Sequence, residues 1–360
     1  MTDEKERLQA GQADAAADDS SGATGPPTHI APSPHVRDRS RFTRGMMLDV
    51  LIALAPLMVV SLLVFRQYAI YVTVLCVCGC MATEAVFTFL RRKPLSVLDC
   101  SAVVTGVILA MSLPWNCPWY VAVIAAAAAV ALGKMIFGGL GQNLFNPAMV
   151  GRAFVMICFA SSMSASAYVD KEGKLDKAWL TGATPMSAVK TAEGAEGSEQ
   201  AEQSAPAGAT LFNLFIGKVN GSLGETSALA CLIGGAYLVL RRTAAWQIPL
   251  GVILSVVVIA GIAQLAGAEV GLLYHLFGGA LLFGAFYIAT DPTSSPLTPV
   301  GRLIFGLGVG GLVMLLRLAS SYPEGVMFAV LLMNAVVPLI NRWTIPTPVG
   351  GPVPKQGEGR

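Results

Sequence analysis

Charged residues are scarce in this chain. Only 13% of its 360 residues are charged and 54% are hydrophobic, against roughly 25% charged residues in soluble globular domains. The mean hydropathy is +0.63. Such a composition cannot cover a folded core with polar surface, so the chain is predicted to lie in a lipid bilayer. The net charge is only +2, and no basic patch with interleaved aromatics occurs, so we expect no nucleic acid partner.

Cysteine clusters and a nucleotide-binding glycine loop are also missing. Most of the seven cysteines lie within apolar runs, where they are expected to pack as small hydrophobes rather than to form disulfides. Cys76, Cys78 and Cys80 are closely spaced, but on a helix Cys78 faces away from the other two, which argues against a metal site. The chain has no iron–sulfur cysteine set and no dinucleotide fingerprint, so neither an iron–sulfur cluster nor a Rossmann-type nucleotide site is expected in it.

What the chain does contain is a series of apolar runs. Five precede and five follow a long polar segment, and each approaches the ~20 residues that a helix needs to cross a bilayer. The expected spans lie near residues 46–65, 68–90, 96–113, 118–137, 148–168, 226–240, 246–265, 270–289, 300–319 and 325–341. We therefore predict an all-α polytopic membrane protein with about ten transmembrane helices.

The two sets of five spans suggest an internal duplication. An odd number of spans in each half puts the halves in opposite topology, which gives an inverted repeat. Residues 146–154 and 298–305 are alike, since each segment has a proline followed shortly by a Gly-Arg pair. Two inverted five-helix repeats with interrupted helices are predicted.

Lysine and arginine residues orient the chain. One side of the predicted membrane receives Arg91, Lys134, Arg241, Arg302 and Arg342, so by the positive-inside rule this side and both termini are cytoplasmic. The long polar segment then faces the periplasm of a bacterial inner membrane. The expected divisions are a disordered cytoplasmic tail (1–32), a first membrane repeat (33–168), a periplasmic loop (169–225), a second membrane repeat (226–342) and a cytoplasmic tail (343–360).

Two interrupted segments gather polar side chains between apolar runs. Gly138–Pro147 contains Asn143 and Asn146, and Ala289–Pro296 contains Asp291 among hydroxyl residues. These amides and this carboxylate suit the donors and acceptors of a planar heterocycle such as an isoalloxazine ring. Composition alone fits a solvated loop equally well.

Ionisable residues within the spans are candidates for function, because burying a charge in lipid costs several kcal/mol. Glu84 lies deepest and is predicted to be a cation ligand or a proton relay. Asp99 is the second candidate for the ion path, although Asp49 and Asp99 both lie near the cytoplasmic ends of their spans, where a carboxylate can also simply reach water. Arg317 completes the set.

The polar segment contains the sequence Thr181-Gly182-Ala183-Thr184. Small neighbours leave the Thr184 hydroxyl sterically open, and Gly182 permits backbone angles that other residues disfavour. Taken alone, such a stretch is most often an exposed turn.

Several stretches together, from about residue 33 to 342, are similar to one family. The chain resembles the D subunit of the Rnf electron-transport complex and its relative, the B subunit of the sodium-translocating NADH:quinone reductase. The short N-terminal region and the Ser-Pro-His opening favour the Rnf protein. The matching stretches are Ser33–His35, Met47–Pro56, Ser101–Gly106, Gly141–Arg152, Leu180–Pro185, Gly221–Ser227 and Ala289–Pro292.

The resemblance implies a covalent flavin. Thr184 would carry FMN through a phosphoester bond, installed from FAD by a dedicated flavin transferase on the outer side, and Thr181, Gly182 and Ala183 would provide recognition and access. The family's motif often has an acidic residue three positions before the first Ser/Thr, where this chain has Ala178.

The resemblance also implies a second, non-covalent flavin within the membrane, either riboflavin or FMN. Asn143, Asn146 and Asp291 are its candidate ligands. The implied fold resembles that of urea channels, which agrees with the two inverted repeats. No metal ligands are predicted.

The expected function is that of a membrane flavoprotein subunit in an Rnf-type complex. Electrons would pass through its flavins in a ferredoxin- and NAD-linked chain coupled to Na⁺ or H⁺ translocation, with no complete activity in this chain alone. Its expected partners are other membrane subunits, a second flavinylated subunit, iron–sulfur subunits, the flavin transferase and membrane lipid. Two alternatives are the quinone-reductase protein and a channel or transporter of the same fold without redox chemistry.

Overall fold

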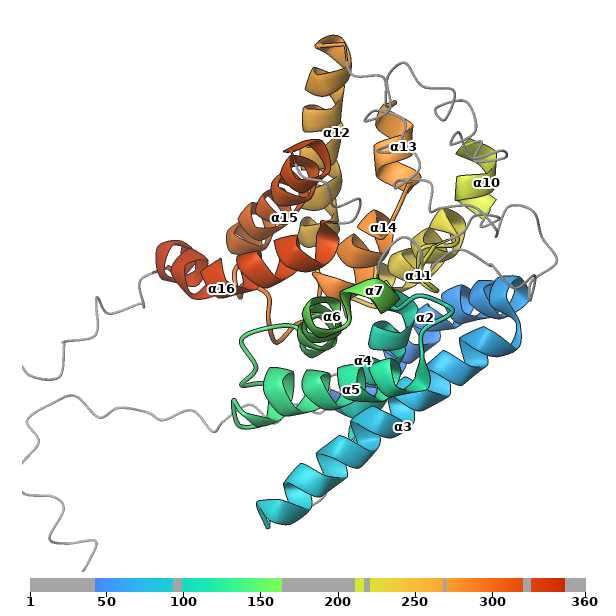
Figure 1. Ribbon diagram of the computed structural model, residues 1–360. Coiled ribbons are helices and arrows are strands. Elements are labelled where there is room, and N and C mark those ends of the chain that lie inside the picture. Colours follow the sequence, from blue (N-terminus) through green and yellow to red (C-terminus); the bar gives the residue numbers. More distant parts are fainter. Residues whose placement is uncertain are drawn as a thin grey trace, which may run out of the picture. The chain divides into compact units, whose positions relative to one another are not determined.

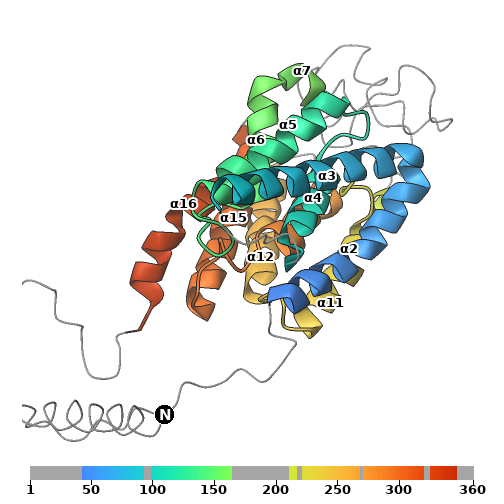
Figure 2. The ribbon, with the colours of Figure 1, turned by 90° about the horizontal axis from the view of Figure 1, so that it is seen from below.

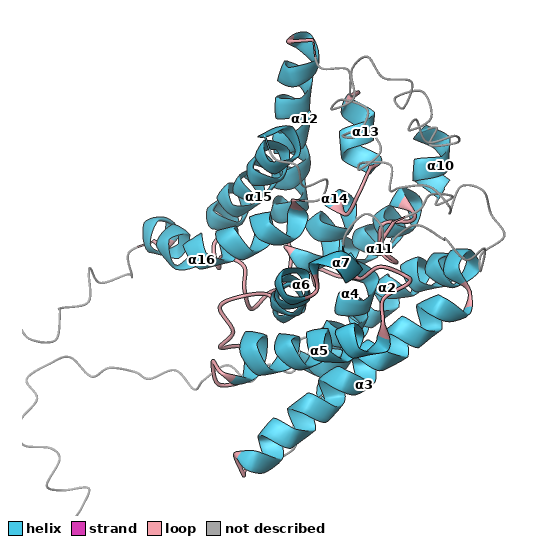
Figure 3. Ribbon diagram, in the orientation of Figure 1, coloured by secondary structure: helices cyan, strands magenta, loops and turns pink. Residues whose placement is uncertain are grey.

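The computed structural model describes residues 43–92, 99–163, 211–216, 221–267, 271–319 and 325–346, all within one contact unit, Ser40–Arg360. These residues are mainly helical and contain no strand; a single isolated bridge joins Pro114 and Ser222 (Figures 1 and 3). The all-α class is confirmed. The stretch Thr181–Thr184 lies outside the described residues.

The described part before the polar segment holds six α-helices and one π-helix. They are α2 (Thr43–Phe65), α3 (Gln67–Leu90), α4 (Ser101–Ser112), α5 (Trp119–Val130), η4 (Ala131–Met135), α6 (Pro147–Cys158) and α7 (Ala160–Met163). After it come α10 (Leu211–Ile216), α11 (Ala228–Leu240), α12 (Gln247–Leu265), α13 (Leu272–Phe277), α14 (Leu281–Phe283), η7 (Gly284–Ile288), α15 (Pro299–Ala319) and α16 (Val326–Thr344).

Five of these helices are long and apolar enough to cross a membrane, namely α2, α3, α12, α15 and α16. The apolar helices α4, α6 and α11 and the continuous α5–η4 unit are shorter, so the count of ten spans stays a prediction. The expected span near residues 270–289 is an interrupted helix. α13 ends at Phe277, and Gly279 adopts a φ of 69°, which glycine tolerates but which interrupts the helix before α14.

Large apolar side chains cover the outside of the long helices. Leu63 on α2 is 69% exposed, Phe89 on α3 is 81% exposed and Leu265 on α12 is 92% exposed. Apolar surface on this scale is stable in contact with lipid rather than water, and helices satisfy their own backbone hydrogen bonds there. The composition-based prediction of a membrane protein is therefore supported by where the apolar residues lie.

Small residues allow the helices to approach closely. A methyl group on Gly106 of α4 would lie 2.7 Å from Val77 Cα of α3, and one on Gly251 of α12 would lie 2.9 Å from Leu303 O of α15. Close approach of this kind is the usual basis of helix packing in membranes. α2 also packs along α11, so the parts before and after the polar segment are joined (Figure 2).

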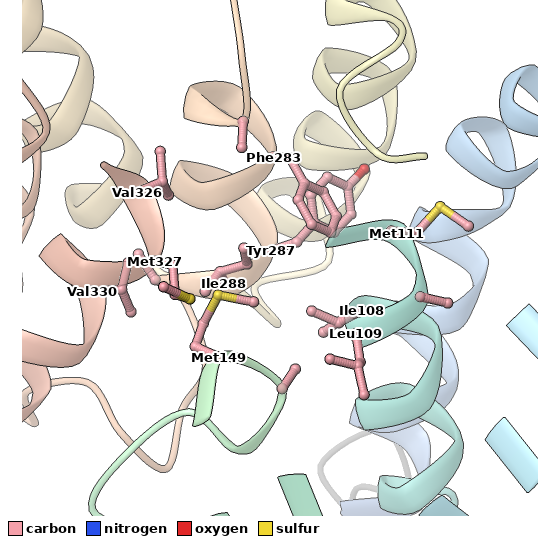
Figure 4. Close-up of a cluster of buried hydrophobic side chains, with 14 of the residues drawn as sticks. Ile108, Leu109, Met111, Met149, Phe283, Tyr287, Ile288, Val326, Met327 and Val330 are labelled. Atoms are coloured by element: carbon pink, nitrogen blue, oxygen red, sulfur yellow. The ribbon is translucent and has the colours of Figure 1, made fainter. Parts of the chain in front are cut away.

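A buried apolar cluster fills the centre of this arrangement. α4 contributes Ile108, Leu109 and Met111, and α6 contributes Met149. Phe283 from α14 and Tyr287 from η7 face them, with α16 on the other side through Val326 and Met327 (Figure 4). The cluster thereby fixes α4, α6, η7 and α16 around one point.

A short structural pattern occurs in both halves. α6 and α15 each begin at a proline, Pro147 and Pro299, the position where the missing N–H costs nothing. Asn146 Oδ1 caps α6 by accepting from Ala148 N at 3.0 Å, and Thr298 Oγ1 accepts from Gly301 N at 3.0 Å. Each helix follows a π-helix and a non-helical connection. The two similar segments therefore share a local structure, while the inverted relation of the halves stays a prediction.

Candidate functional site

The two interrupted segments contact one another. Asn143 Nδ2 donates a hydrogen bond to Thr293 Oγ1 at 2.8 Å, and Asn146 Nδ2 donates to the Ile288 carbonyl at 3.1 Å. Asn334 of α16 completes this junction: its amide, oriented by its hydrogen bonds, accepts from Asn146 N at 3.0 Å and donates to Ser294 O at 3.2 Å. Three parts of the chain are thus held together by amide groups.

Asp291 organises the connection before α15. Its carboxylate accepts from Thr293 N at 3.2 Å, from Thr293 Oγ1 at 2.9 Å and from Ser294 Oγ at 3.1 Å, a pattern typical of an Asx turn. The carboxyl is half-buried beside a cavity, and the protein atoms around it raise its pKa by desolvation, while the hydrogen bonds from Thr293 and Ser294 oppose that rise. A hydrogen-bonded chain therefore runs from Asn143 through Thr293 to Asp291.

A cavity lies where these segments meet α2, α4 and η4. Its volume is about 70 Å³, more than the ~10–15 Å³ that one water molecule requires. Most of its wall is apolar, and its polar members include Ser101, Lys134, Asn143, Asn146, Thr290 and Asp291. The structure therefore places all three candidate flavin ligands at one cavity.

The three candidates differ in what they can offer a ligand. Asn143 Oδ1 is buried and has no hydrogen-bond partner among the described residues, and Asn143 is part of the cavity wall. Asn146 Oδ1 already caps α6 and its Nδ2 holds Ile288, so this side chain mainly fixes the wall. Asp291 is engaged by its own turn but still lines the cavity. A role of these residues in binding a cofactor stays a prediction.

The wall has both a rigid and an adaptable part. Tyr287 is held in place because its hydroxyl donates to the Ala53 carbonyl at 3.0 Å, across the two halves of the chain. Met46, Met47 and Leu140 lie elsewhere on the wall, and methionine side chains repack easily. The wall thus combines a fixed aromatic side chain with side chains that can adapt to a bound molecule.

Glu84 is fully buried and forms an ion pair. Lys134 Nζ, in the π-helix η4, lies 2.7 Å from Glu84 Oε1 and donates a second hydrogen bond to Ser101 Oγ at 2.6 Å. Ser101 Oγ in turn donates to Asp99 Oδ1 at 2.6 Å. The structure thus connects both predicted ion-path carboxylates through Ser101 and Lys134. We name this series of four hydrogen-bonded side chains the Glu84–Asp99 chain. Single-turn π-helices are frequent at functional sites.

Lys134 differs most from its sequence-based interpretation. The positive-inside rule counts it among the cytoplasmic charges, at the inner end of the expected span near residues 118–137, whereas its side chain is only 2% exposed and is paired inside the protein. Its place in an apolar run is a usable signal, because a buried lysine requires a partner. The position of that partner, 50 residues earlier, cannot be read from the sequence.

The two remaining ionisable candidates stabilise the fold. Asp49 is buried and does not simply reach water: it accepts from Thr243 Oγ1 at 3.0 Å and pairs with Arg241 Nη2 at 3.3 Å. Arg317, buried in α15, donates to the carbonyls of His275 and Gly278. These two carbonyls lie at the C-terminal end of α13, so Arg317 satisfies the acceptors that the helix break leaves.

Similarity to known proteins extends over most of the chain rather than over the cavity alone. The sequence profile of the NQR2, RnfD, RnfE family matches residues 29–350. The D subunit of the Na(+)-translocating ferredoxin:NAD(+) oxidoreductase complex of Acetobacterium woodii is 40% identical over 315 residues, which cover 88% of this chain and 93% of that protein.

Two further relatives are similar over comparable lengths. The D subunit of the proton-translocating ferredoxin:NAD(+) oxidoreductase complex of Clostridium ljungdahlii is 37% identical, covering 89% of this chain and 96% of that protein. The D subunit of the ion-translocating oxidoreductase complex of Stutzerimonas stutzeri is 40% identical, covering 85% of this chain and 91% of that protein.

Proposed function

This chain belongs to the NQR2, RnfD, RnfE family, and on that premise we propose that it is the membrane flavoprotein subunit of an Rnf-type complex. The observation that carries the proposal is the identity of 37–40% with D subunits over more than 90% of their length. The chain is accordingly a subunit of an ion-translocating oxidoreductase. Its partners are the other subunits of that complex, including a second flavinylated subunit and iron–sulfur subunits.

A covalent FMN on Thr184 is the first part of this function. The flavin transferase joins the Thr184 Oγ to the FMN phosphorus of FAD, AMP leaves, and the hydroxyl proton passes to solvent. A periplasmic flavin held only by non-covalent contacts can be lost to the medium, whereas an ester retains it whatever its binding free energy. The protein supplies placement and the flavin supplies the one-electron chemistry. Thr181, Gly182 and Ala183 give the transferase access.

A non-covalent flavin in the cavity is the second part. The buried Asn143 Oδ1 offers an acceptor to a ring N–H, the polar side of the cavity offers donors, and Tyr287 gives a flat apolar wall. These features fit an isoalloxazine ring once the flexible wall side chains have moved. Asn146 and Asp291 hold the wall in place and define its polar edge.

The third part is an ion path on the Glu84–Asp99 chain. Asp99 is half-buried and Glu84 is fully buried, so the Glu84–Asp99 chain leads from near the surface to the interior of the protein. The named relatives include a Na(+)-translocating and a proton-translocating complex, so either ion fits. The proposed orientation places both termini in the cytoplasm and residues 169–225 in the periplasm of a bacterial inner membrane.

One experiment distinguishes the proposed function from two alternatives. Mass spectrometry of the peptide spanning residues 180–190, from protein made with the flavin transferase, should show FMN added at Thr184. An unmodified peptide would favour a channel or transporter without redox chemistry. A flavinylated complex with quinone-dependent turnover and no ferredoxin requirement would instead identify the quinone-reductase protein.

A further inference from the structure

One cation faces both the cavity and the buried carboxylate. Lys134 lines the cavity together with Ser101, Asn143 and Asp291. The same Lys134 Nζ contacts Glu84 Oε1 at 2.7 Å and Ser101 Oγ at 2.6 Å. The residue that neutralises Glu84 is therefore also a residue of the cavity wall.

The charges of this region must stay balanced because they are out of water. The side chains of Lys134 and Glu84 are 2% and 0% exposed, and a buried charge without a counter-charge is strongly destabilised. A negative charge added to the cavity attracts Lys134. The Glu84 carboxylate then requires another cation, since its own counter-charge has turned toward the cavity.

The Glu84–Asp99 chain gives such a cation a route. Asp99 is half-buried, its Oδ1 lies 2.6 Å from Ser101 Oγ, and Ser101 in turn contacts Lys134. Carboxylate and hydroxyl oxygens line the route. Among the described residues, other titratable groups of the region include Cys80 of α3, which interacts with Glu84 and Lys134, Cys100 next to Ser101, Tyr287 of η7, and Asp291 on the cavity wall.

We propose that Lys134 is a tethered cation shared between Glu84 and the cavity, so that each electron added to a flavin in the cavity is balanced by one small monovalent cation bound at Glu84. The proposal rests on the flavin site proposed above. One electron arrives from a partner redox centre of the complex and reduces the flavin. One Na⁺ or H⁺ enters from water, Lys134 keeps its protons, and no covalent bond forms or breaks except the bond to an added proton.

The test measures the redox potential of the cavity flavin rather than turnover. Full-length chain carrying Thr184→Ala is placed in lipid nanodiscs and loaded with riboflavin, so that the visible absorbance reports the cavity alone. Spectroelectrochemical titrations are run at increasing Na⁺ at constant pH, and at varied pH without Na⁺. One cation bound per electron raises the midpoint potential by about 59 mV for each tenfold rise in that cation. Because the reduced ring can itself take up protons, the part of each dependence that Glu84→Gln removes distinguishes Na⁺ from H⁺.

Four variants assign the effect to residues. Glu84→Gln and Lys134→Gln should abolish the dependence on the cation, and Lys134→Arg should keep it. Asp49→Asn is the matched control, because it removes a buried carboxylate from a separate ion pair with Arg241, and it should also keep the dependence. A further, double variant, Glu84→Gln with Lys134→Gln, leaves neither charge of the pair buried, so it serves where a single variant fails to fold, and it should lose the dependence.

The outcomes separate this inference from the flavin site. The inference is overturned if riboflavin binds but its midpoint potential depends on neither cation. It is also overturned if the potential depends on the cation equally in the parent and in the double variant. Both results leave the proposed flavin site standing. A parent chain that retains no riboflavin overturns both. Loss of the dependence in Glu84→Gln with retention in Asp49→Asn supports the shared-cation role of Lys134.

Discussion

Asn143 Nδ2 donates a hydrogen bond to Thr293 Oγ1 at 2.8 Å across 150 residues of sequence. The same threonine hydroxyl donates to Asp291 at 2.9 Å. One hydroxyl therefore links the connection before α6 to the connection before α15, at the cavity where the flavin is proposed to bind. Removing it disturbs both segments at once.

Loss of the flavin ester is the most direct prediction. Thr184→Ala removes the only oxygen of that side chain, so protein made with the flavin transferase should lose its ultraviolet fluorescence on a denaturing gel after boiling in SDS. Ser187→Ala, which removes a hydroxyl close by in the sequence, should keep the band. Retained fluorescence in Thr184→Ala would show that FMN is attached elsewhere.

Thr293→Val tests the junction of the two segments. The substitution keeps the shape but removes the acceptor for Asn143 and a donor to Asp291, so riboflavin should dissociate at least tenfold more readily, equivalent to about 1.4 kcal/mol. Fluorescence quenching of added riboflavin in the Thr184→Ala background measures this. Thr83→Val is the control, because that hydroxyl bonds within α3, to Gly79 O. Equal affinity in both variants would place the riboflavin outside this cavity.

The buried ion pair makes a prediction about stability. Lys134→Met leaves Glu84 without its counter-charge and should destabilise the chain by about 3–5 kcal/mol, as expected when one partner of a buried pair is removed. The double variant Lys134→Met, Glu84→Leu replaces the pair by apolar groups and should regain most of that loss. Denaturation of the purified proteins in one detergent compares them. A double variant as unstable as the single one would mean that the pair acts through packing rather than charge.

Glu84→Gln tests the ion path in the complete complex. The amide keeps the size of the side chain but cannot carry the negative charge that holds a cation, so ion uptake into membrane vesicles should fall while electron flow continues. Asp49→Asn again provides the comparison, since Asp49 is paired with Arg241. Normal ion uptake in Glu84→Gln, measured with electron flow on the same vesicles, would remove Glu84 from the path.

The sequence predicts the fold class and several candidate site residues, because both depend on the chemistry of short stretches of residues. Long apolar runs report burial in lipid, and a carboxylate within such a run, as at Glu84, reports a functional or paired charge. Asn143, Asn146 and Asp291 are found in the same way, as polar groups between apolar runs. That the three lie at one site follows only from the family resemblance, because their common cavity depends on contacts between distant segments that composition and spacing do not show.

Other features escape the sequence for different reasons. Residues 270–289 are apolar throughout most of their length, so hydropathy predicts one span, but the backbone breaks near Gly279, where φ is 69°. Hydropathy does not report φ. Charge alone counts Lys134 among the residues of the cytoplasmic side, whereas its contact with Glu84 allows it to be buried. Arg317 is explained only once the broken end of α13 is known.

The position of Asn334 has a consequence for biosynthesis. This residue lies on α16, close to the end of the described chain, yet its amide joins Asn146 N to Ser294 O. The junction between the connections before α6 and α15 is therefore complete only once α16 has packed against both. A ribosome-bound chain that still lacks α16 holds these two connections without the amide between them, so this junction forms only after α16 has been translated and packed.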